Sequence, residues 1–144
     1  MTAFLSRRRA FIAGLAMLTL LLVACSSGGA TPQPSGAEPP ADCARVDAGV
    51  ITLSAKDLKF SAPCMVANAD EAFTIHFTND ENQPHNVAIY PDTSKASELA
   101  KGDIITGPDQ STDIEVGALA AGQYFFDCQV HPTIIGTLYV VAGG

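Results

Sequence analysis

The chain has 144 residues, with 15 Asp or Glu against 8 Lys or Arg, so its net charge at pH 7 is −7. This length accommodates one domain of ordinary size rather than a multidomain enzyme. The acidic balance argues against nucleic acid as a partner, because binding to a phosphate backbone depends on basic patches.

Residues 1–24 are typical of a secretory signal peptide. A basic start at residues 7–9 precedes an apolar run over 11–24, which is shorter than the ~20 residues that a membrane-spanning helix needs. The three residues before Cys25, Leu-Val-Ala, resemble a bacterial lipobox, whose cleavage leaves the cysteine lipidated at the new N-terminus. The arginine pair resembles a twin-arginine signal, so the export route, Sec or twin-arginine, stays open. The alternative is an uncleaved anchor helix with a free thiol at Cys25, which the short run disfavours.

Residues 26–41 are small, polar, Pro or Gly, so with Cys25 they predict a disordered linker over 25–41. We expect it to tether the remaining domain, residues 42–144, to the extracytoplasmic face of a bacterial membrane. Without the signal, 5 basic residues remain against 15 acidic ones, which gives a net charge of −10. A basic protein partner would suit this surface, although a generally acidic, soluble surface explains it equally well.

The domain is predicted to consist almost entirely of strands. Short apolar runs and period-two alternation mark them, in chain order, at 50–53, 58–60, 73–78, 85–90, 112–116, 124–126 and 136–141. One short helix is predicted from Asp92 to Ala100, with Asp92 or Thr93 as its cap and Gly102 after its end. Short strands separated by Gly, Pro and Asn predict an all-β fold, an antiparallel Greek-key β-sandwich.

Four cysteines occur in a chain that we expect to be exported into an oxidising compartment. If Cys25 carries lipid, three remain, and one of them must have a use other than a disulfide. Cys43 and Cys64 lie early in the domain with no histidine nearby, whereas Cys128 has His131 three positions later. We therefore predict a Cys43–Cys64 disulfide, although sequence alone leaves other pairings open.

Three residues are candidates for a metal site at one end of the sandwich. His85 opens a strand after a polar turn, and Cys128 and His131 flank the turn between the last two strands. Two imidazoles and one thiolate suit copper in both of its common oxidation states. Taken singly, His85 is more often a solvated histidine and Cys128 a small buried residue. His76 lies in mid-strand away from any cysteine and is predicted to be structural or exposed.

The segments PHNVAIY (84–90) and YFFDCQVHP (124–132), followed by GTL (136–138), resemble those of the cupredoxins, the small blue-copper electron carriers. The resemblance covers roughly residues 48–142. It implies a cupredoxin-like sandwich in which His85, Cys128 and His131 bind one copper ion and Asn86 ties the two ligand loops together. The chain is also similar to single-copper relatives of the cytochrome c oxidase subunit II domain. A dinuclear centre is excluded because the loop has only one cysteine.

The position where the family usually has an axial methionine is occupied differently in this chain. Thr133-Ile134-Ile135-Gly136 follows His131, so Ile134, or Ile135 if the loop is shifted by one residue, is expected on the axial side. The axial contact is weak and long, so the three equatorial ligands suffice for binding. Because an isoleucine donates no electrons to Cu(II), we expect a raised reduction potential.

These observations predict a lipid-anchored, monomeric, extracytoplasmic electron carrier that is not an enzyme. Its partners would be membrane-bound or soluble redox proteins of respiration. Two alternatives remain. One is a copper chaperone or delivery module with the same ligands, against which the absence of a Met cluster counts modestly. The other is a sandwich that has lost its copper.

Overall fold

The structure, a computed structural model, describes residues 38–143. The predicted signal peptide, the lipidation site at Cys25 and most of the predicted linker lie outside the described residues. Among residues 38–143, no helix combines the length and the hydropathy needed to cross a membrane.

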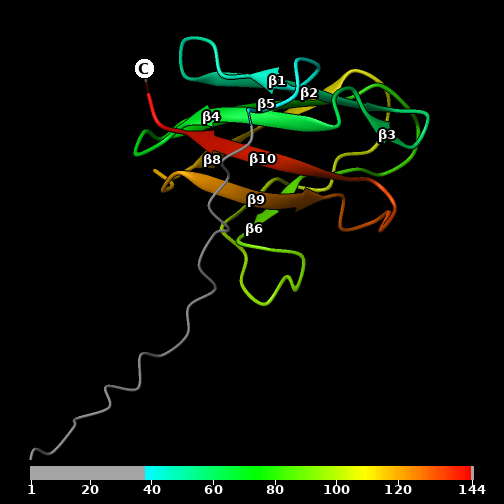
Figure 1. The fold of residues 1–144 in the computed structure, drawn as a ribbon. Coiled ribbons are helices and arrows are strands. Elements are labelled where there is room, and N and C mark those ends of the chain that lie inside the picture. Colours follow the sequence, from blue (N-terminus) through cyan, green and yellow to red (C-terminus); the bar gives the residue numbers. More distant parts are fainter. Residues whose placement is uncertain (1–37, 144) are drawn as a thin grey trace, which may run out of the picture.

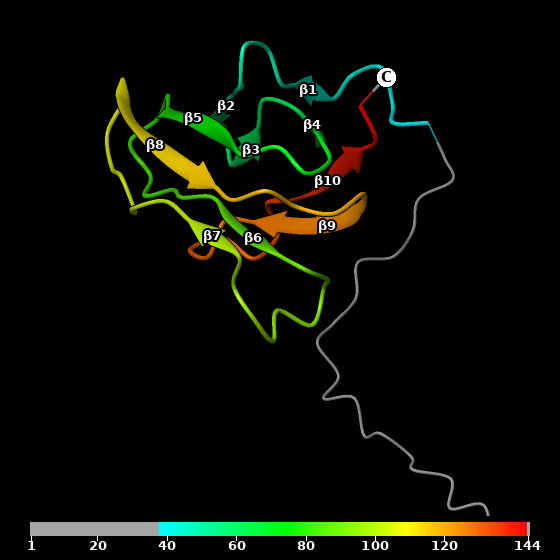
Figure 2. The ribbon, with the colours of Figure 1, turned by 90° about the vertical axis from the view of Figure 1, so that its left-hand side faces the viewer.

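Two β-sheets pack face to face in the described part of the chain, as Figure 1 and Figure 2 show from two directions. The larger sheet has, in spatial order, β1 (Ala44–Arg45), β4 (Cys64–Asn68), β10 (Ile135–Val141), β9 (Gly122–Asp127), β6 (Ala88–Tyr90) and β7 (Ala100–Lys101). The smaller sheet has β3 (Lys59–Phe60), β2 (Val50–Lys56), β5 (Phe73–Asn79) and β8 (Gln110–Val116). The predicted β-sandwich is confirmed.

Alternating apolar residues build the core between the sheets. On β5, Phe73, Ile75 and Phe77 are buried while the residues between them are partly exposed, as period two requires. β2, β8, β9 and β10 also alternate, and their inward side chains form one hydrophobic cluster with those of β5. β4 differs, because it is buried on both faces: Met65 faces the main core, and Val66 packs in a second cluster with Cys43 and Cys64.

The sheets are mixed rather than purely antiparallel, so this detail of the prediction was wrong. β1 pairs with β4, β4 with β10, and β2 with β5, all in parallel. Successive strands along the chain often belong to opposite sheets, so their partners come from distant parts of the sequence. The chain between two such paired strands passes through the opposite sheet. It does not form a tight hairpin, so the two strands can run parallel.

The helix predicted from Asp92 to Ala100 does not form. An Asp92 carboxylate oxygen accepts a hydrogen bond from the Ser94 amide, and Lys95 has φ of 54°, which an α-helix does not allow. The segment forms a loop that extends away from both sheets (Figure 1; Figure 2). The Leu99 amide donates to the Ile89 carbonyl at 2.8 Å, and Lys95 pairs with Asp127 at 2.8 Å. These tertiary contacts replace the hydrogen bonds that a helix would have made.

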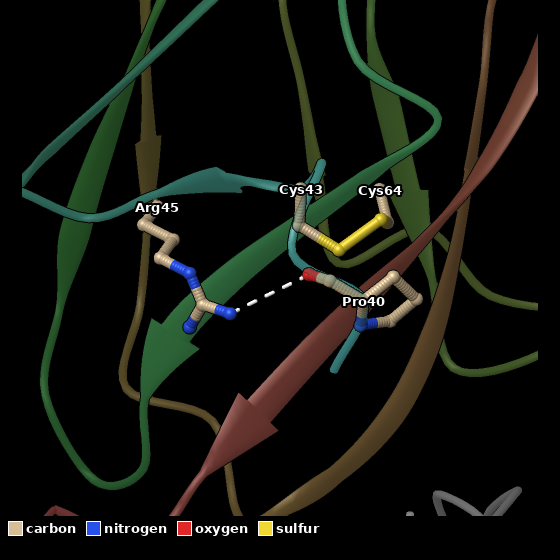
Figure 3. Close-up of a disulfide and its surroundings, with 4 residues drawn as sticks. All are labelled: Pro40, Cys43, Arg45 and Cys64. Carbon is tan, nitrogen blue, oxygen red and sulfur yellow. Dashed lines mark hydrogen bonds between the residues drawn. A yellow bond between two sulfur atoms is a disulfide. The ribbon is translucent and has the colours of Figure 1, made fainter. Parts of the chain in front are cut away.

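The predicted Cys43–Cys64 disulfide is present (Figure 3). It joins the residue before β1 to the first residue of β4, across a sequence separation of 21 residues. Arg45 Nη2 donates to the Pro40 carbonyl at 3.4 Å beside it. A crosslink over a loop of this length stabilises a fold by roughly 3 kcal/mol. It fixes the described N-terminal segment to the larger sheet.

Candidate metal centre

His85 and Cys128 reach the same edge of the larger sheet because of how β6 and β9 pair. These strands are antiparallel, with Ala88 opposite Asp127, so the start of β6 lies beside the end of β9. Cys128 follows the last residue of β9, and His85 lies three residues before β6. A pair of backbone hydrogen bonds with Ile105, both 3.0 Å, holds His85 in place. Residues 43 positions apart are thereby brought together.

The third residue, His131, is placed by two consecutive turns between β9 and β10. The His131 amide donates to the Cys128 carbonyl at 3.2 Å, and the Ile134 amide donates to the His131 carbonyl at 2.9 Å. Pro132 occupies the second position of the latter turn, where its restricted φ is favourable. The Cys128 amide donates to the Ile134 carbonyl at 2.9 Å and closes the loop. The loop is drawn in orange-red at the right-hand end of Figure 1.

Two imidazole nitrogens converge on one sulfur. Cys128 Sγ lies 3.7 Å from His85 Nδ1 and 3.8 Å from His131 Nδ1. The two rings lie with their centroids 4.7 Å apart. His85 and Cys128 are fully buried, and His131 is partly exposed. One ring nitrogen from each histidine and the sulfur of Cys128 all lie within 4.8 Å of one another.

The other nitrogen of His85 is held by a carboxylate. His85 Nε2 lies 2.7 Å from Glu81 Oε1, and the same oxygen accepts a hydrogen bond from the Leu58 amide at 3.0 Å. The Leu58 hydrogen bond is the largest cause of a lowered pKa for Glu81; partial desolvation opposes it, and the His85 hydrogen bond lowers the pKa further. Glu81 was not predicted as part of the site.

Asn86 connects the loop that carries His85 to the loop that carries Cys128. Its Oδ1 accepts from the Gln129 amide at 2.9 Å, and its Nδ2 donates to Gln129 Oε1 at 3.0 Å. Gln129 Nε2 in turn donates to Tyr90 Oη at 2.9 Å and to Glu98 at 3.0 Å. Gln129 is a second contributor that sequence reasoning missed, because its partners lie 31 to 43 residues away.

The two candidate axial residues differ in how far they are exposed to solvent. Ile134 is 3 % exposed, whereas Ile135 is 54 % exposed. Both line a hollow of about 250 Å³ whose other walls include Leu58 and Phe60. One flank of the loop is therefore apolar.

The remaining histidine lies elsewhere. His76 is in the middle of β5, with 44 % of its side chain exposed, and its Nδ1 lies 2.7 Å from Asp113 of β8. It does not belong to the group formed by His85, Cys128 and His131. Its placement at the surface agrees with the prediction that it is structural or exposed.

Comparison with known proteins places this arrangement in a family. The chain matches the profile of the Cupredoxin-like domain over residues 14–140. Among solved structures, reduced auracyanin from the photosynthetic bacterium Roseiflexus castenholzii is similar, with a TM-score of 0.58 and 19 % identity. That match covers 67 % of this chain and 98 % of auracyanin.

Auracyanin A, a "blue" copper protein from the green thermophilic photosynthetic bacterium Chloroflexus aurantiacus, is similar with a TM-score of 0.54 and 19 % identity. The match covers 67 % of this chain and 98 % of auracyanin A. No match was found among curated proteins. At this identity the solved structures establish the fold, and the profile covers most of the chain. The protein therefore belongs to the cupredoxin-like family.

Proposed function

We propose that the protein binds one copper ion through His85 Nδ1, Cys128 Sγ and His131 Nδ1 and serves as an electron carrier. One observation carries this proposal: two imidazole nitrogens point at the same sulfur, at 3.7 and 3.8 Å. A thiol is only a weak hydrogen-bond donor and its sulfur only a weak acceptor, so hydrogen bonding gives little reason for two imidazoles to converge on Cys128. A shared metal ion accounts for both contacts.

The spacing of the three donor atoms fits such an ion. A first-row metal about 2.0 Å from nitrogen and about 2.3 Å from sulfur holds those atoms roughly 3.7 Å apart when the angle between the bonds is near 120°. The two observed distances match this trigonal value. Imidazole suits copper and thiolate favours Cu(I), so the donor set accommodates both oxidation states. The blue copper chemistry stated for auracyanin A supports the same assignment.

The surrounding chain suits electron transfer, because it holds the three donors in fixed positions. Bound copper supplies the exchange of one electron between Cu(I) and Cu(II). Three features restrain the donors: the paired backbone hydrogen bonds of His85, the closure of the loop at Ile134, and the two hydrogen bonds between Asn86 and Gln129. Restrained donors need little rearrangement when the charge of the ion changes. The chain therefore acts as a carrier and performs no substrate chemistry in this proposal.

Ile134, rather than Ile135, is proposed to occupy the axial side. Its burial at 3 %, against 54 % for Ile135, supports this choice. An aliphatic side chain offers Cu(II) no electron pair, so Cu(I) is relatively favoured and the reduction potential is raised. We expect Ile134→Met to lower the reduction potential, measured by redox titration of the copper-loaded protein. Ile135→Met is the matched control and should leave the potential near that of the wild type. The axial assignment would be wrong if the two variants behaved alike.

We propose a redox protein as the partner, meeting the molecule at its His131 edge. His131 is the partly exposed member of the three donors, so it offers the shortest path out of the site. The net charge of −10 without residues 1–24 suits a basic partner.

We also propose export and lipidation of Cys25, which would hold the domain at the outer face of a bacterial membrane. Mass spectrometry of the mature chain and of Cys25→Ser tests this: the lipid mass should be lost in the variant.

The decisive experiment is the visible absorption spectrum of the purified protein after one equivalent of Cu(II), with Cys128→Ser alongside. An intense thiolate-to-copper charge-transfer band that is absent from the variant would support the proposal. Absence of the band from the wild type, with Cys128 still a free thiol, would contradict it. Competition for Cu(I) would then separate a Cu(I)-only delivery module from a sandwich that has lost its metal.

A further inference from the structure

The segment between β5 and β6 places a carboxylate behind the buried histidine of the site. Asn79, the last residue of β5, is fully buried, and its Nδ2 donates to the carbonyls of Gln83 and Ile105 at 2.7 and 2.9 Å. Its Oδ1 accepts from the Glu81 amide at 3.0 Å. The neighbouring Asp80 amide donates to the carbonyl of Ala55 at 2.9 Å. The backbone around Glu81 is thus fixed on both sides.

The side chain of Glu81 is fixed as well. Its Oε1 accepts from the Leu58 amide at 3.0 Å, within the two-residue turn between β2 and β3. Asp57 and Leu58 of that turn have φ of 52° and 56°, as a type I′ hairpin turn requires. This geometry directs the Leu58 amide to the carboxylate. Glu81 is only 19 % exposed, so the carboxylate is held on the inner side of the turn.

The contact with His85 determines where the imidazole carries its proton. A carboxylate only accepts hydrogen bonds, so at 2.7 Å from Glu81 Oε1 the His85 Nε2 must be the donor. A neutral imidazole has one N–H, and with that proton on Nε2 the lone pair lies on Nδ1. Nδ1 is the atom that faces Cys128 Sγ at 3.7 Å. Histidines that bind metals in proteins commonly donate their other N–H to a carboxylate or carbonyl in this way.

We propose that Glu81 is a positioning residue that fixes the Nε2–H tautomer of His85, presents Nδ1 to the metal, and lowers the reduction potential of the bound copper. The last effect follows because a negative charge behind a ligand stabilises Cu(II) more than Cu(I). Glu81 and Ile134 therefore act on the potential in opposite directions. The inference deepens the proposed function, and only its statements about copper rest on that function.

The tautomer is tested first, in the metal-free protein. Long-range ¹H–¹⁵N correlation spectra of histidine rings distinguish a protonated from an unprotonated nitrogen. For the neutral His85 ring of the wild type we expect Nε2 protonated and Nδ1 bare, and for Glu81→Ala a mixture of tautomers. An Nδ1–H tautomer in the wild type, or an unchanged tautomer in Glu81→Ala, would overturn the proposal. This result is independent of copper, so failure to bind copper would contradict the proposed function alone.

The copper-loaded protein tests the role of the charge. Glu81→Gln keeps an oxygen that accepts from both Leu58 and His85 but removes the charge, and Asp80→Asn removes a charge from the same turn without a hydrogen bond to His85. We expect a higher potential in Glu81→Gln than in Asp80→Asn, and a copper affinity about 10- to 100-fold lower in Glu81→Ala than in the wild type. Equal potentials in the two amide variants would overturn the role of the charge. A merely structural Glu81 would change the unfolding midpoint in Glu81→Ala and leave the potential of Glu81→Gln at that of Asp80→Asn.

Discussion

Cysteine sulfur occupies two regions of the described chain, and their surroundings differ. Cys43 and Cys64 are bonded to each other beside β4 and packed against Val66, with Tyr139 and Val141 at the edge of the cluster. Cys128 lies beyond the end of β9, where its sulfur is free and two imidazole nitrogens approach it.

The difference shows that the neighbours of a cysteine decide its chemistry. An Asp42 oxygen lies close to the Cys43 and Cys64 sulfurs, so that region too has the composition of a metal site. Its sulfurs are joined in a disulfide, however, and a metal ligand must be a thiolate. Cys128 is in no disulfide, and His85 Nδ1 and His131 Nδ1 lie 3.7 and 3.8 Å from its sulfur. The disulfide of the first region therefore stabilises the fold, whereas the thiol of the second region is available to bind a metal ion.

The largest expected effect separates the two regions by metal binding. Cys128→Ser should abolish the charge-transfer band, because the band needs the thiolate. The double variant Cys43→Ala/Cys64→Ala should retain it, because those sulfurs lie in the other region. Absorption spectra of the two variants with one equivalent of Cu(II) test this. Loss of the band in the folded double variant would show that the two regions are coupled.

The second effect is on stability, and here the double variant Cys43→Ala/Cys64→Ala is expected to lose more than Cys128→Ser. Removal of the disulfide should lower the free energy of unfolding by roughly 3 kcal/mol, because the unfolded chain regains the entropy of a loop of about 21 residues. Cys128→Ser in the metal-free protein should be less destabilising, since a buried thiol is replaced by a slightly smaller hydroxyl. Denaturant unfolding measures both. A larger loss in Cys128→Ser would contradict the structural role assigned to the disulfide.

A smaller effect is expected where the two regions meet. A Cβ at Gly136, the second residue of β10, would collide with the Phe126 ring and lie 2.7 Å from the carbonyl oxygen of Pro63, the residue before Cys64. Gly136→Ala should therefore lower the free energy of unfolding by about 1–3 kcal/mol through overpacking. Gly117→Ala is the control, because its Cβ would meet nothing within 4 Å. Equal denaturant midpoints for the two variants would contradict the close packing.

The smallest effect concerns the residue next to Cys128 and appears at alkaline pH. The Asp127 carboxylate is buried and pairs with Lys95 at 2.8 Å; this hydrogen bond, and then the charge of Asp127, raises the pKa of Lys95 above its ordinary 10.5. A group whose pKa is raised by folding contributes fully below its unfolded value and loses that contribution as pH rises through its folded value.

Lys95→Met should accordingly be less stable than the wild type at neutral pH, and the difference should shrink above pH 10.5. Denaturant unfolding of both proteins at neutral pH and above pH 10.5 measures this difference. Other groups that titrate at alkaline pH do so in both proteins, so their effects largely cancel. A difference that stays constant over this range would mean that the ion pair does not contribute to stability.

Sequence-based predictions were correct where a local pattern decides the structure and failed where contacts with distant segments decide it. The alternation of Phe73, Ile75 and Phe77 predicted β5 correctly, because one face of that strand packs on the core and the other does not. β4 was missed, since it is buried on both faces and so has no period to detect. The helix from Asp92 was wrong because contacts to Ile89 and Asp127 outside the segment decide its conformation.

By itself, the sequence determined the sandwich and the three side chains that the fold would bring together, and it favoured the pairing of Cys43 with Cys64. Each depends on residue type, local alternation or the number of thiols, all of which are visible along the chain. Only the tertiary structure decided the parallel strand pairs, the burial of Ile134 rather than Ile135, and the place of Glu81 behind His85. Those features depend on hydrogen bonds and packing between segments far apart in the chain, such as Leu58 and Glu81, and no local pattern encodes them.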